Sequence, residues 1–300
     1  ICLMKQSLPN LIIAGIHKAA TTSLYTYLTS HPDIYGPGKK EIHYFTPIRF
    51  NKDIKNIEEY KEFYKNWKNE KYAIDASPSY IYGGKPLMHK MIDILPPHKI
   101  IVILRNPVDR FISNYNYLKS KLFIEDFYTL NLFIDKCLEE EKKTLIDDDF
   151  SRAIIEGRYV DFIPEWIEYY KEDFKIIYFE DIVKNTKMIM KELAVWLDID
   201  KAVFDRMTYT EENKTIFVKN KILHKSALYF NHKFEIFWRK NLKLKVFFRN
   251  MYYNLNKKNV DKHDRNLEEV ERLISIYADS NKRLLAYLQS KNLSLPDWLK

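Results

Sequence analysis

Lys18 stands in a short segment whose residue types suit the binding of an anion. The apolar run Leu11–Ile16 before it has the length and β-branched content of a buried parallel strand. Thr21, Thr22 and Ser23 then begin a stretch with helical spacing, so the loop lies at a helix N-terminus. Unpaired backbone N–H groups and the positive end of the helix dipole meet there. We therefore expect an anion-binding loop; the alternative is an ordinary strand–loop–helix unit with a solvated lysine.

A second polar loop, Gly36–Phe45, has residues suited to acid–base chemistry. Two lysines, a carboxylate and an imidazole fall within five positions, in the run Lys39-Lys40-Glu41-Ile42-His43. The glycines and the proline before this run predict a loop. A carboxylate beside two lysines stays ionised, and it can accept a proton from a hydroxyl group within about 3 Å. The structural alternatives are a solvated carboxylate at Glu41 and a structural histidine at His43.

Arg105 directly follows another strongly predicted strand. The run Lys99–Leu104 is almost continuously apolar, and Asn106-Pro107 combines a favoured N-cap with a favoured first helical residue. Ser113 then lies two turns into the predicted helix. Ligands of doubly wound sheets bind at the carboxyl edge of the strands, which is where Arg105 falls. The alternatives are a surface ion pair for Arg105 and a helix-face position for Ser113.

Predicted strands and helices alternate along most of the chain. Short apolar runs predict two further strands, at Lys71–Asp75 and Lys175–Phe179. Helical spacing predicts helices at Ile57–Trp67, Pro86–Leu95, Thr129–Lys143, Val160–Tyr170 and Thr186–Leu197. This alternation predicts an α/β fold with a central parallel sheet flanked by helices. We expect a single domain over residues 1–300, with a helical insertion at about 214–265 and a C-terminal helix at about 267–290.

The composition indicates a folded domain with an anionic partner. The formal net charge of the 300 residues is +8, which suits a nucleotide, an acidic glycan, a nucleic acid or a membrane surface. Cys2 and Cys137 form neither a disulfide framework nor a metal motif, which favours a reducing compartment. No apolar run approaches the roughly 18–20 residues of a membrane helix. Ile1–Leu8 is too short for a signal peptide, so we expect neither feature here; what precedes Ile1 stays open.

The Lys18 loop differs from the common phosphate-binding loops. A Walker A loop has a glycine directly before its lysine, whereas His17 stands there, and G-x-G-x-x-G is also absent. No Walker B carboxylate is evident, which argues against a magnesium-dependent phosphoryl transferase. A less charged group could be transferred with a lysine, hydroxyls and backbone N–H groups alone. Sulfuryl transfer from a nucleotide fits that description.

Three segments together resemble the sulfotransferases that use 3′-phosphoadenosine 5′-phosphosulfate (PAPS), particularly the bacterial members and the heparan-sulfate-type branch. These segments are Gly15–Leu24, Lys40–Phe45 and Arg105–Ser113. The resemblance continues more weakly through Gly157-Arg158-Tyr159, Trp166, the strand near Ile176–Asp181 and the end of the chain at Trp298. It implies a P-loop-like nucleotide-binding sulfotransferase fold, PAPS as donor, adenosine 3′,5′-bisphosphate (PAP) as product, and no metal.

The resemblance also implies roles for the matching residues. The loop that holds the 5′-phosphosulfate would be formed by Lys18, Ala19, Ala20, Thr21, Thr22 and Ser23. Lys18 would also stabilise charge on the bridging oxygen as it leaves, and fixed donors of this kind supply much of such catalysis. Arg105 and Ser113 would bind the 3′-phosphate. Glu41 would be the catalytic base that takes the proton from the acceptor hydroxyl, with His43 as a supporting histidine.

Three positions depart from the family pattern. Ala20 stands where the family loop commonly has glycine; an alanine lets the backbone approach an anion if its conformation is helical rather than left-handed. Asp75-Ala76-Ser77-Pro78 lacks a lysine that the heparan-sulfate branch often has, which weakens the transfer of a heparan sulfate acceptor to this chain. The basic loop before the last helix has only Lys262 and Arg265 as candidates.

The segment 214–265 is strongly basic and aromatic. It has fourteen Lys or Arg residues against three Asp or Glu, with ten Phe, Trp or Tyr residues between them. A helical insertion that buries its rings and solvates its lysines is the simpler hypothesis. The functional hypothesis is that residues 221–258 dock a polyanionic or lipid-linked glycan, or hold the protein at an anionic membrane surface.

The sequence therefore predicts a PAPS-dependent sulfotransferase that acts on a hydroxyl-bearing acceptor, a carbohydrate or a glycolipid. We expect a cytoplasmic enzyme, with membrane association through the basic segment as an option, and we do not expect a nucleic acid partner. The alternative from another class is a non-catalytic nucleotide- or nucleic-acid-binding protein with the same anion loop. A kinase of the nucleoside or shikimate type with a degenerate loop is a third hypothesis.

Overall fold

The computed structural model describes residues 8–125, 127–143, 151–209, 217–218, 220–234, 244, 248, 251–253, 255–258 and 266–300. The chain divides into two compact units. The first comprises Ile1–Arg110, Ile154–Asn213 and Ile276–Lys300, and the second comprises Phe111–Ala153 and Lys214–Ser275.

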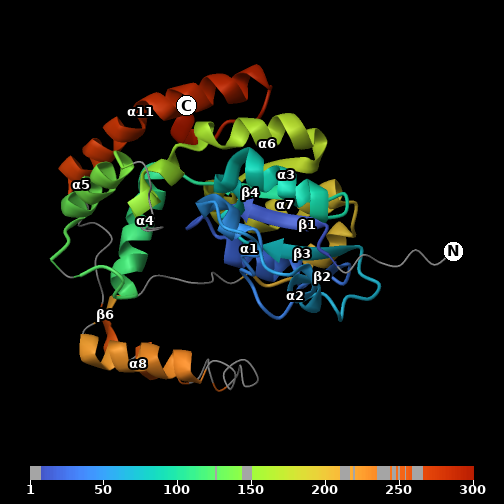
Figure 1. Ribbon diagram of the computed structural model, residues 1–300, viewed down its shortest axis with the longest axis horizontal. Helices are drawn as coiled ribbons and strands as arrows, with labels where there is room; N and C mark the ends of the chain where they lie inside the picture. The colour runs from blue at the N-terminus through green and yellow to red at the C-terminus, as the bar shows by residue number, and fades with distance from the viewer. Residues whose placement is uncertain are drawn as a thin grey trace. The chain divides into compact units, whose positions relative to one another are not determined.

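The first unit is built on a five-stranded parallel sheet (Figure 1), as predicted. The strands are β1 (Leu11–Gly15), β2 (Ile34–Tyr35), β3 (Tyr72–Ala76), β4 (Lys99–Leu104) and β5 (Phe174–Tyr178), in the order β2-β3-β1-β4-β5. Register pairs include Ile12 with Asp75 of β3 and Ile12 with Ile100 of β4. From β1 the chain passes to β2 and β3 on one side of β1, and the connection after β3 then leads to β4 on its other side, so the winding direction reverses at β1. Ligands bind beside such a reversal, at the carboxyl edge.

The α-helices of the described residues are α1 (Thr21–Leu28), α2 (Ile57–Glu62), α3 (Gly84–Ile94), α4 (Pro107–Ser120), α5 (Leu130–Glu141), α6 (Ile163–Tyr170), α7 (Phe179–Leu197), α8 (Lys221–Lys233) and α11 (Leu267–Ser290). The 3-10 helices are η1 (Thr46–Phe50), η2 (Tyr80–Gly83), η3 (Ser151–Ala153), η4 (Ile155–Gly157), η5 (Tyr159–Asp161), η6 (Lys171–Asp173), η7 (Lys201–Asp205) and η8 (Asp297–Leu299). Of these α-helices, α4 and α11 each run from one unit into the other.

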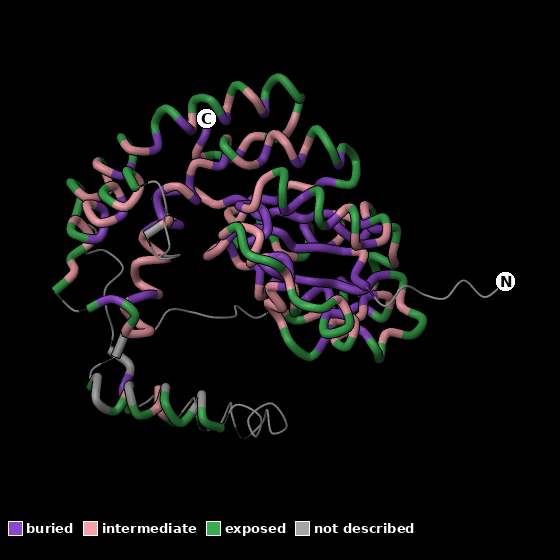
Figure 2. Tube along the Cα trace, viewed as in Figure 1, coloured by how far each residue is buried: buried purple, intermediate pink, exposed green. Residues whose placement is uncertain are grey.

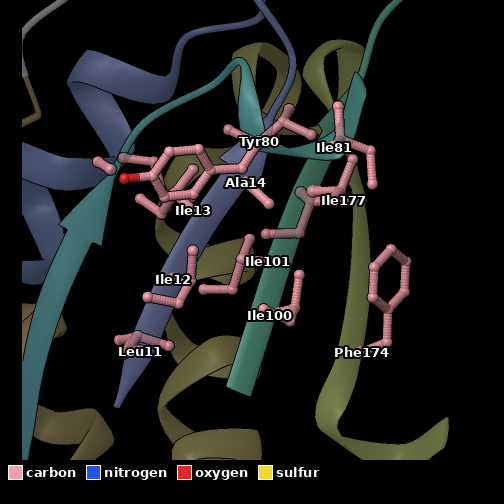
Figure 3. Packing of buried hydrophobic residues seen from close by; sticks show 14 of the residues in the cluster. Leu11, Ile12, Ile13, Ala14, Tyr80, Ile81, Ile100, Ile101, Phe174 and Ile177 are labelled. Carbon is pink, nitrogen blue, oxygen red and sulfur yellow. The ribbon is translucent and has the colours of Figure 1, made fainter. Parts of the chain in front are cut away.

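The core of the first unit is the sheet and the helices around it (Figure 2), where the strands are almost entirely buried. Side chains of β1, β4 and β5 pack together there (Figure 3). All residues of β1 are buried, which explains why the strand lacks the alternation of a half-exposed strand. Full burial of each such aliphatic side chain contributes about 1.5–3 kcal/mol. The strand that carries the Lys18 loop is thereby fixed on both faces.

The predicted elements differ from the observed ones mainly at their ends. Strand β4 and helix α11 have the predicted bounds, and the predicted helix at Thr186–Leu197 extends back to Phe179 across a non-helical Asn185. The predicted helix at Ile57–Trp67 ends already at Glu62. Strand β2 was missed, because two residues are too few to show an alternating pattern.

The described part of the second unit contains α5, α8, most of α4 and the start of α11. A short antiparallel pair, β6 (Phe217–Val218) with β7 (Lys257–Lys258), lies within the segment predicted to be a helical insertion. His224 of α8 anchors that helix: its Nδ1 lies 2.6 Å from the Tyr252 hydroxyl and its Nε2 lies 2.6 Å from the Ser120 carbonyl. The two loop candidates Lys262 and Arg265 lie outside the described residues.

Candidate active site

The predicted anion loop lies between β1 and α1 at the carboxyl edge of the sheet. Lys18 has a left-handed backbone with φ 67°, and so has Ala20 with φ 62°. An alanine at position 20 was expected to let the backbone approach an anion if its conformation is helical, but the backbone of Ala20 is left-handed. A left-handed alanine is strained because its Cβ approaches the carbonyl oxygen, whereas a glycine is not. The fold holds Ala20 in the conformation that a glycine would adopt freely.

The N-terminus of α1 is available to an anion on the side of this loop. Ala20 is the N-cap residue of the eight-residue helix and, lacking a side-chain oxygen, makes no side-chain cap hydrogen bond. A helix N-terminus has four backbone N–H groups without a helical partner. Of the three predicted hydroxyl residues, Thr21 and Ser23 are buried and Thr22 is half-buried; Ala19 is fully buried. Thr22 is therefore the hydroxyl most open to a ligand.

Arg105 and the Lys18 loop are brought together. Arg105 Nη1 donates a hydrogen bond of 2.8 Å to the Lys18 carbonyl, and the guanidinium carbon lies 4.2 Å from the centre of the Phe179 ring. Arg105 Nε is buried without a hydrogen-bond partner among the described residues. Burial lowers the pKa of Arg105 below its usual range. A buried donor of a guanidinium that lies against an anion loop suits the oxygen of a bound phosphate.

The segment after Arg105 is fixed by capping. As predicted, Asn106 is placed before the first helical residue, Pro107, and its Oδ1 accepts from Val108 N at 3.0 Å. Asn106 N in turn donates to Glu180 Oε1 at 2.9 Å, at the end of the neighbouring strand β5. The Arg105 carbonyl accepts from the Tyr159 hydroxyl at 2.7 Å. The peptide group that joins Arg105 to Asn106 is thus fixed through both its carbonyl and its N–H.

Ser113 is the seventh residue of α4 and is half-buried. The helix begins two residues after Arg105, in the first unit, and has passed into the second unit at Phe111. The predicted pairing of Ser113 with Arg105 on one phosphate stays a prediction.

Glu41 lies in a turn and is bound by its neighbours. Lys40 Nζ donates to Glu41 Oε1 at 2.5 Å, and His43 Nε2 lies 3.7 Å from Oε2. Burial alone would raise the pKa of Glu41, but the hydrogen bond of His43 and the charge and hydrogen bond of Lys40 outweigh it and lower the pKa to about 2. The side chain keeps 43% of its surface exposed. Glu41 is therefore ionised and accessible at neutral pH.

His43 lies beside Glu41 and is held from the other side by hydroxyl groups. Its Nδ1 lies 3.2 Å from Thr46 Oγ1 and 3.3 Å from Ser79 Oγ. Its Nε2 faces Glu41. Like Glu41 (φ 61°), His43 has a left-handed backbone, with φ 58°. The base loop, residues 40–43, thus brings together the carboxylate and the imidazole that the sequence predicted to cooperate.

One buried carboxylate that the sequence did not predict, Glu156 of η4, connects several parts of the site. It is 4% exposed, and its carboxylate lies 3.0 Å from Arg49 Nη2, 3.4 Å from His17 Nδ1 and 3.6 Å from Arg110 Nη1. Burial alone would raise the pKa of Glu156, but its contacts with His17, Arg49 and Arg110 lower it to about 2. Glu156 therefore joins the start of the anion loop, the helix after the base loop and the start of α4. Its partners lie 139 and 107 residues away for His17 and Arg49, so no local pattern marks it.

Asp75, at the end of β3, is a second buried carboxylate without a predicted role. It accepts hydrogen bonds from Tyr60, Ser77 and Tyr80. Its position after an apolar strand, at the carboxyl edge, is the signal that could have singled it out.

Among the described residues, no three His, Cys, Asp or Glu side chains gather as a metal ion would require. The same part of the chain has no helix long and apolar enough to cross a membrane.

Comparisons with known proteins agree with the motifs. The family model for a sulfotransferase domain matches residues 8–246. The bifunctional heparan sulfate N-deacetylase/N-sulfotransferase 1 of Caenorhabditis briggsae is 24% identical over 310 residues, covering 99% of this chain and 32% of the relative. The membrane-associated sulfotransferase kil1 of Dictyostelium discoideum is 36% identical over 110 residues, covering 37% of this chain and 23% of the relative. The chain thus spans about a third or less of the length of these relatives.

A solved structure shares the fold. The crystal structure of a sulfotransferase from Alicyclobacillus acidocaldarius superposes with a TM-score of 0.69 at 20% sequence identity, covering 97% of this chain and 99% of that one. The parallel sheet with its flanking helices is therefore the P-loop-like α/β fold of that protein.

Proposed function

Because the chain belongs to the sulfotransferase family, we propose that it transfers a sulfuryl group from PAPS to a hydroxyl group of an acceptor. The observation that carries this proposal is the 2.8 Å hydrogen bond from Arg105 Nη1 to the Lys18 carbonyl. It brings the Arg105 guanidinium to the loop that contains Lys18 and that directly precedes the N-terminus of α1. Such a set of donors suits a nucleotide with several anionic groups.

The donor would be held by the anion loop and the strand-end arginine. Lys18, the backbone N–H groups of Ala19 to Thr22 and the Thr22 hydroxyl would bind the 5′-phosphosulfate. The 3′-phosphate would be bound by Arg105 and Ser113. The buried Nε of Arg105, which has no partner among the described residues, supports this assignment.

Transfer would proceed by in-line displacement at sulfur. Glu41 accepts the proton of the acceptor hydroxyl, and the oxygen of that hydroxyl forms a new bond to sulfur. The bond from sulfur to the bridging oxygen breaks, and its electron pair stays on the 5′-phosphate of PAP. Lys18 would stabilise the charge that grows on that oxygen. Glu41 is a weak base at a pKa of about 2, so its proton transfer would come late, when the hydroxyl has become acidic by bonding to sulfur.

For the acceptor we propose a carbohydrate or a glycolipid. The name of the Caenorhabditis briggsae relative refers to heparan sulfate, a carbohydrate. The accessible Glu41 beside Lys40 and His43 supports an acceptor that approaches an electropositive loop.

The test is transfer of label from sulfur-labelled PAPS to a panel of glycans, glycolipids and small alcohols. Wild type should label one class of acceptor, and Lys18→Met and Arg105→Met should each weaken PAP binding, measured by calorimetry. Lys71→Met is a matched control, since its ammonium binds Asp198 rather than the anion loop. No labelled acceptor, together with equal PAP binding by Lys18→Met and wild type, would overturn the proposal.

For a further partner we propose an anionic membrane surface that contacts residues 221–258. Tyr229 and Phe230 of α8 are 61% and 54% exposed, and the segment around them is strongly basic. Exposed rings between cations suit the headgroup region of a membrane. Lys240, Lys243 and Lys245, which lie outside the described residues, supply part of this charge.

Co-sedimentation with vesicles that contain an anionic lipid tests this partner. Tyr229→Ser/Phe230→Ser and Lys240/Lys243/Lys245→Glu should both reduce binding, whereas Phe127→Ser should not. Phe127 is equally exposed, at 63%, but lies outside the segment. Unchanged binding of both variants would contradict the proposal.

We also propose a cytoplasmic location for the chain. The two cysteines of the sequence, Cys2 and Cys137, lie far apart and follow no spacing typical of a disulfide framework, which suits a reducing compartment. Fractionation of cells that express the tagged chain tests this location, and recovery outside the cytoplasm and its membranes would contradict it.

A further inference from the structure

Asp75 is a buried carboxylate whose hydrogen bonds, within the described part of the chain, all come from hydroxyl groups. It is 1% exposed and lies at the carboxyl end of β3, next to the strand that leads to the anion loop. Its Oδ2 accepts from the hydroxyls of Tyr60 at 2.7 Å and Tyr80 at 2.9 Å. Its Oδ1 accepts from Ser77 Oγ at 2.7 Å. The two oxygens thus have different partners: Oδ1 leads through Ser77 to His43 of the base loop, whereas Oδ2 leads through Tyr80 to the Phe45 N–H, two residues beyond that loop.

Ser77 connects this carboxylate to the main chain of His43. A hydroxyl group has one proton, which Ser77 gives to Asp75, so its lone pairs are left as acceptors. The His43 N–H donates to this oxygen at 3.0 Å. The ionised or hydrogen-bonded carboxylate therefore determines which way the Ser77 hydroxyl points. If the Ser77 proton pointed at His43 instead, the His43 N–H would lose its acceptor.

This contact acts on a strained part of the base loop. Glu41 and His43 both have left-handed backbones, which are strained for a residue other than glycine and persist only where surrounding contacts hold them. The imidazole of His43 is fixed separately, by Thr46 and Ser79 on its Nδ1 side. The main chain of His43 is fixed by Ser77. Loss of the hydrogen bond from the His43 N–H to Ser77 would let the main chain of the base loop relax, and Glu41 would move with it.

We propose that Asp75, acting through the Ser77 hydroxyl, is a positioning residue that holds the base loop in the conformation in which Glu41 faces the acceptor. Neither Asp75 nor Ser77 touches substrate in this role. The proposal rests on the proposed function of Glu41 as the base. Because a displacement of about 1 Å can cost a hundredfold in rate, one hydrogen bond to the loop is enough for a large effect.

Ser77→Ala tests the connection directly. It removes the hydroxyl between the carboxylate and the His43 N–H and leaves both of these groups in place. We expect kcat for the labelled acceptor to fall roughly tenfold to a hundredfold, while the Kd for PAP stays within about twofold, since Ser77 does not belong to the anion loop. The proposal would be overturned if Ser77→Ala has the kcat of wild type while Glu41→Gln has lost activity.

Tyr60→Phe is the matched control. It also removes one hydroxyl that donates to Asp75, but from Oδ2, which does not lead to His43. We expect it to lower the melting temperature at least as much as Ser77→Ala does and to leave kcat within about threefold of wild type. If kcat falls equally in both variants, the cluster is merely structural and the proposal is wrong.

A double-mutant cycle separates this proposal from the proposed function. In a Glu41→Gln background, Ser77→Ala should cause no further loss of kcat, because the base that it positions is absent. If Glu41→Gln turns over like wild type, the assignment of the base fails. If Glu41→Gln strongly reduces kcat, and Ser77→Ala lowers the residual rate of that variant by the same factor as it lowers the wild-type rate, only the positioning proposal fails.

Discussion

The anion loop and the base loop are built alike but supported by opposite chemistry. Each has two residues other than glycine in left-handed conformations, Lys18 and Ala20 in one and Glu41 and His43 in the other. Each is also held by a carboxylate that is at least 96% buried by its neighbours. The anion loop is held by Glu156 through His17, and the base loop by Asp75 through Ser77.

The two carboxylates differ in what surrounds them. Glu156 has two arginines and a histidine within 3.6 Å, and these partners outweigh burial and lower its pKa to about 2. Asp75 has only hydroxyl donors; burial raises its pKa, and their hydrogen bonds do not cancel that effect. We call Glu156 with its basic partners the charged hub: one carboxylate joins three distant segments, because each partner reaches it with its own side chain. We call Asp75 with its hydroxyl donors the hydroxyl hub: it orients one short contact, that of Ser77 with the His43 N–H. The comparison predicts that Glu156 matters more for stability and Asp75 more for local geometry.

The largest expected effect is that of Glu156→Gln on stability. This variant leaves the buried Arg49 and Arg110 without their carboxylate, and unpaired buried charge is strongly destabilising. The lowering of the pKa from 4.5 to about 2 corresponds to a loss of about 3 kcal/mol in the free energy of unfolding. Urea denaturation at pH 7, followed by circular dichroism, measures it.

Glu168→Gln is the matched control for this substitution. Glu168 also has a basic partner, Lys291, but is 57% exposed, so solvent screens the pair and its replacement should cost much less than that of Glu156. Equal costs for the two substitutions would mean that the Glu156 hub is no stronger than a surface ion pair.

The next effect is an opposite dependence of the two hubs on pH. Glu156 has a lowered pKa when folded, so its stabilisation is complete above pH 4.5 and is lost as the pH falls toward about 2. Asp75 has a raised pKa when folded, so its charged form becomes a penalty as the pH rises above 3.8. From pH 7 to pH 3.5, the cost of Glu156→Gln should therefore shrink, whereas the cost of Asp75→Asn should grow.

Urea denaturation of wild type and both variants at pH 7, 5 and 3.5 gives the loss of unfolding free energy that each substitution causes at each pH. If both losses change with pH in the same direction, the distinction between a charged hub and a hydroxyl hub is contradicted, whatever the size of each loss.

The smallest effect concerns the strain that both loops share. Ala20→Gly replaces a left-handed alanine by a residue without that strain, and it should stabilise the protein by about 1 kcal/mol. The gain is reduced by the greater freedom of glycine in the unfolded chain. Asn292→Gly is the control, since Asn292 is also left-handed (φ 53°) but asparagine tolerates this conformation. A melting temperature that falls with Ala20→Gly would show that the loop is not strained there.

Most of the sheet and of the loops at its edge could be predicted from local sequence. Strand β4 is a continuous apolar run, Asn106-Pro107 has the preferences of a helix start, and α11 has a long amphipathic repeat. These signals act within a few residues, and the structure confirms them. The type of backbone at Ala20 was not predictable, because its left-handed conformation is imposed by packing around a residue that does not favour it.

The supports of the site could not be predicted in the same way. Glu156 acts on His17 and Arg49, which are more than a hundred residues away, and nothing around Glu156 distinguishes it from a solvated carboxylate. Asp75 lies at a strand end and its contact with Ser77 is local, but its contact with Tyr60, which lies 15 residues away, forms only once α2 packs against β3. Contacts of this range depend on the whole fold, whereas the residues that would touch substrate follow local motifs.

The central claim, that Glu41 is the base of a sulfuryl transfer, is tested most directly by Glu41→Gln. Single-turnover transfer of label from PAPS to the acceptor found in the panel should fall by roughly a hundredfold to ten-thousandfold, since a general base typically contributes that much. The Kd for PAP should stay within about twofold of wild type, because Glu41 does not belong to the anion loop. Transfer at the wild-type rate by a variant that binds PAP normally would contradict the claim.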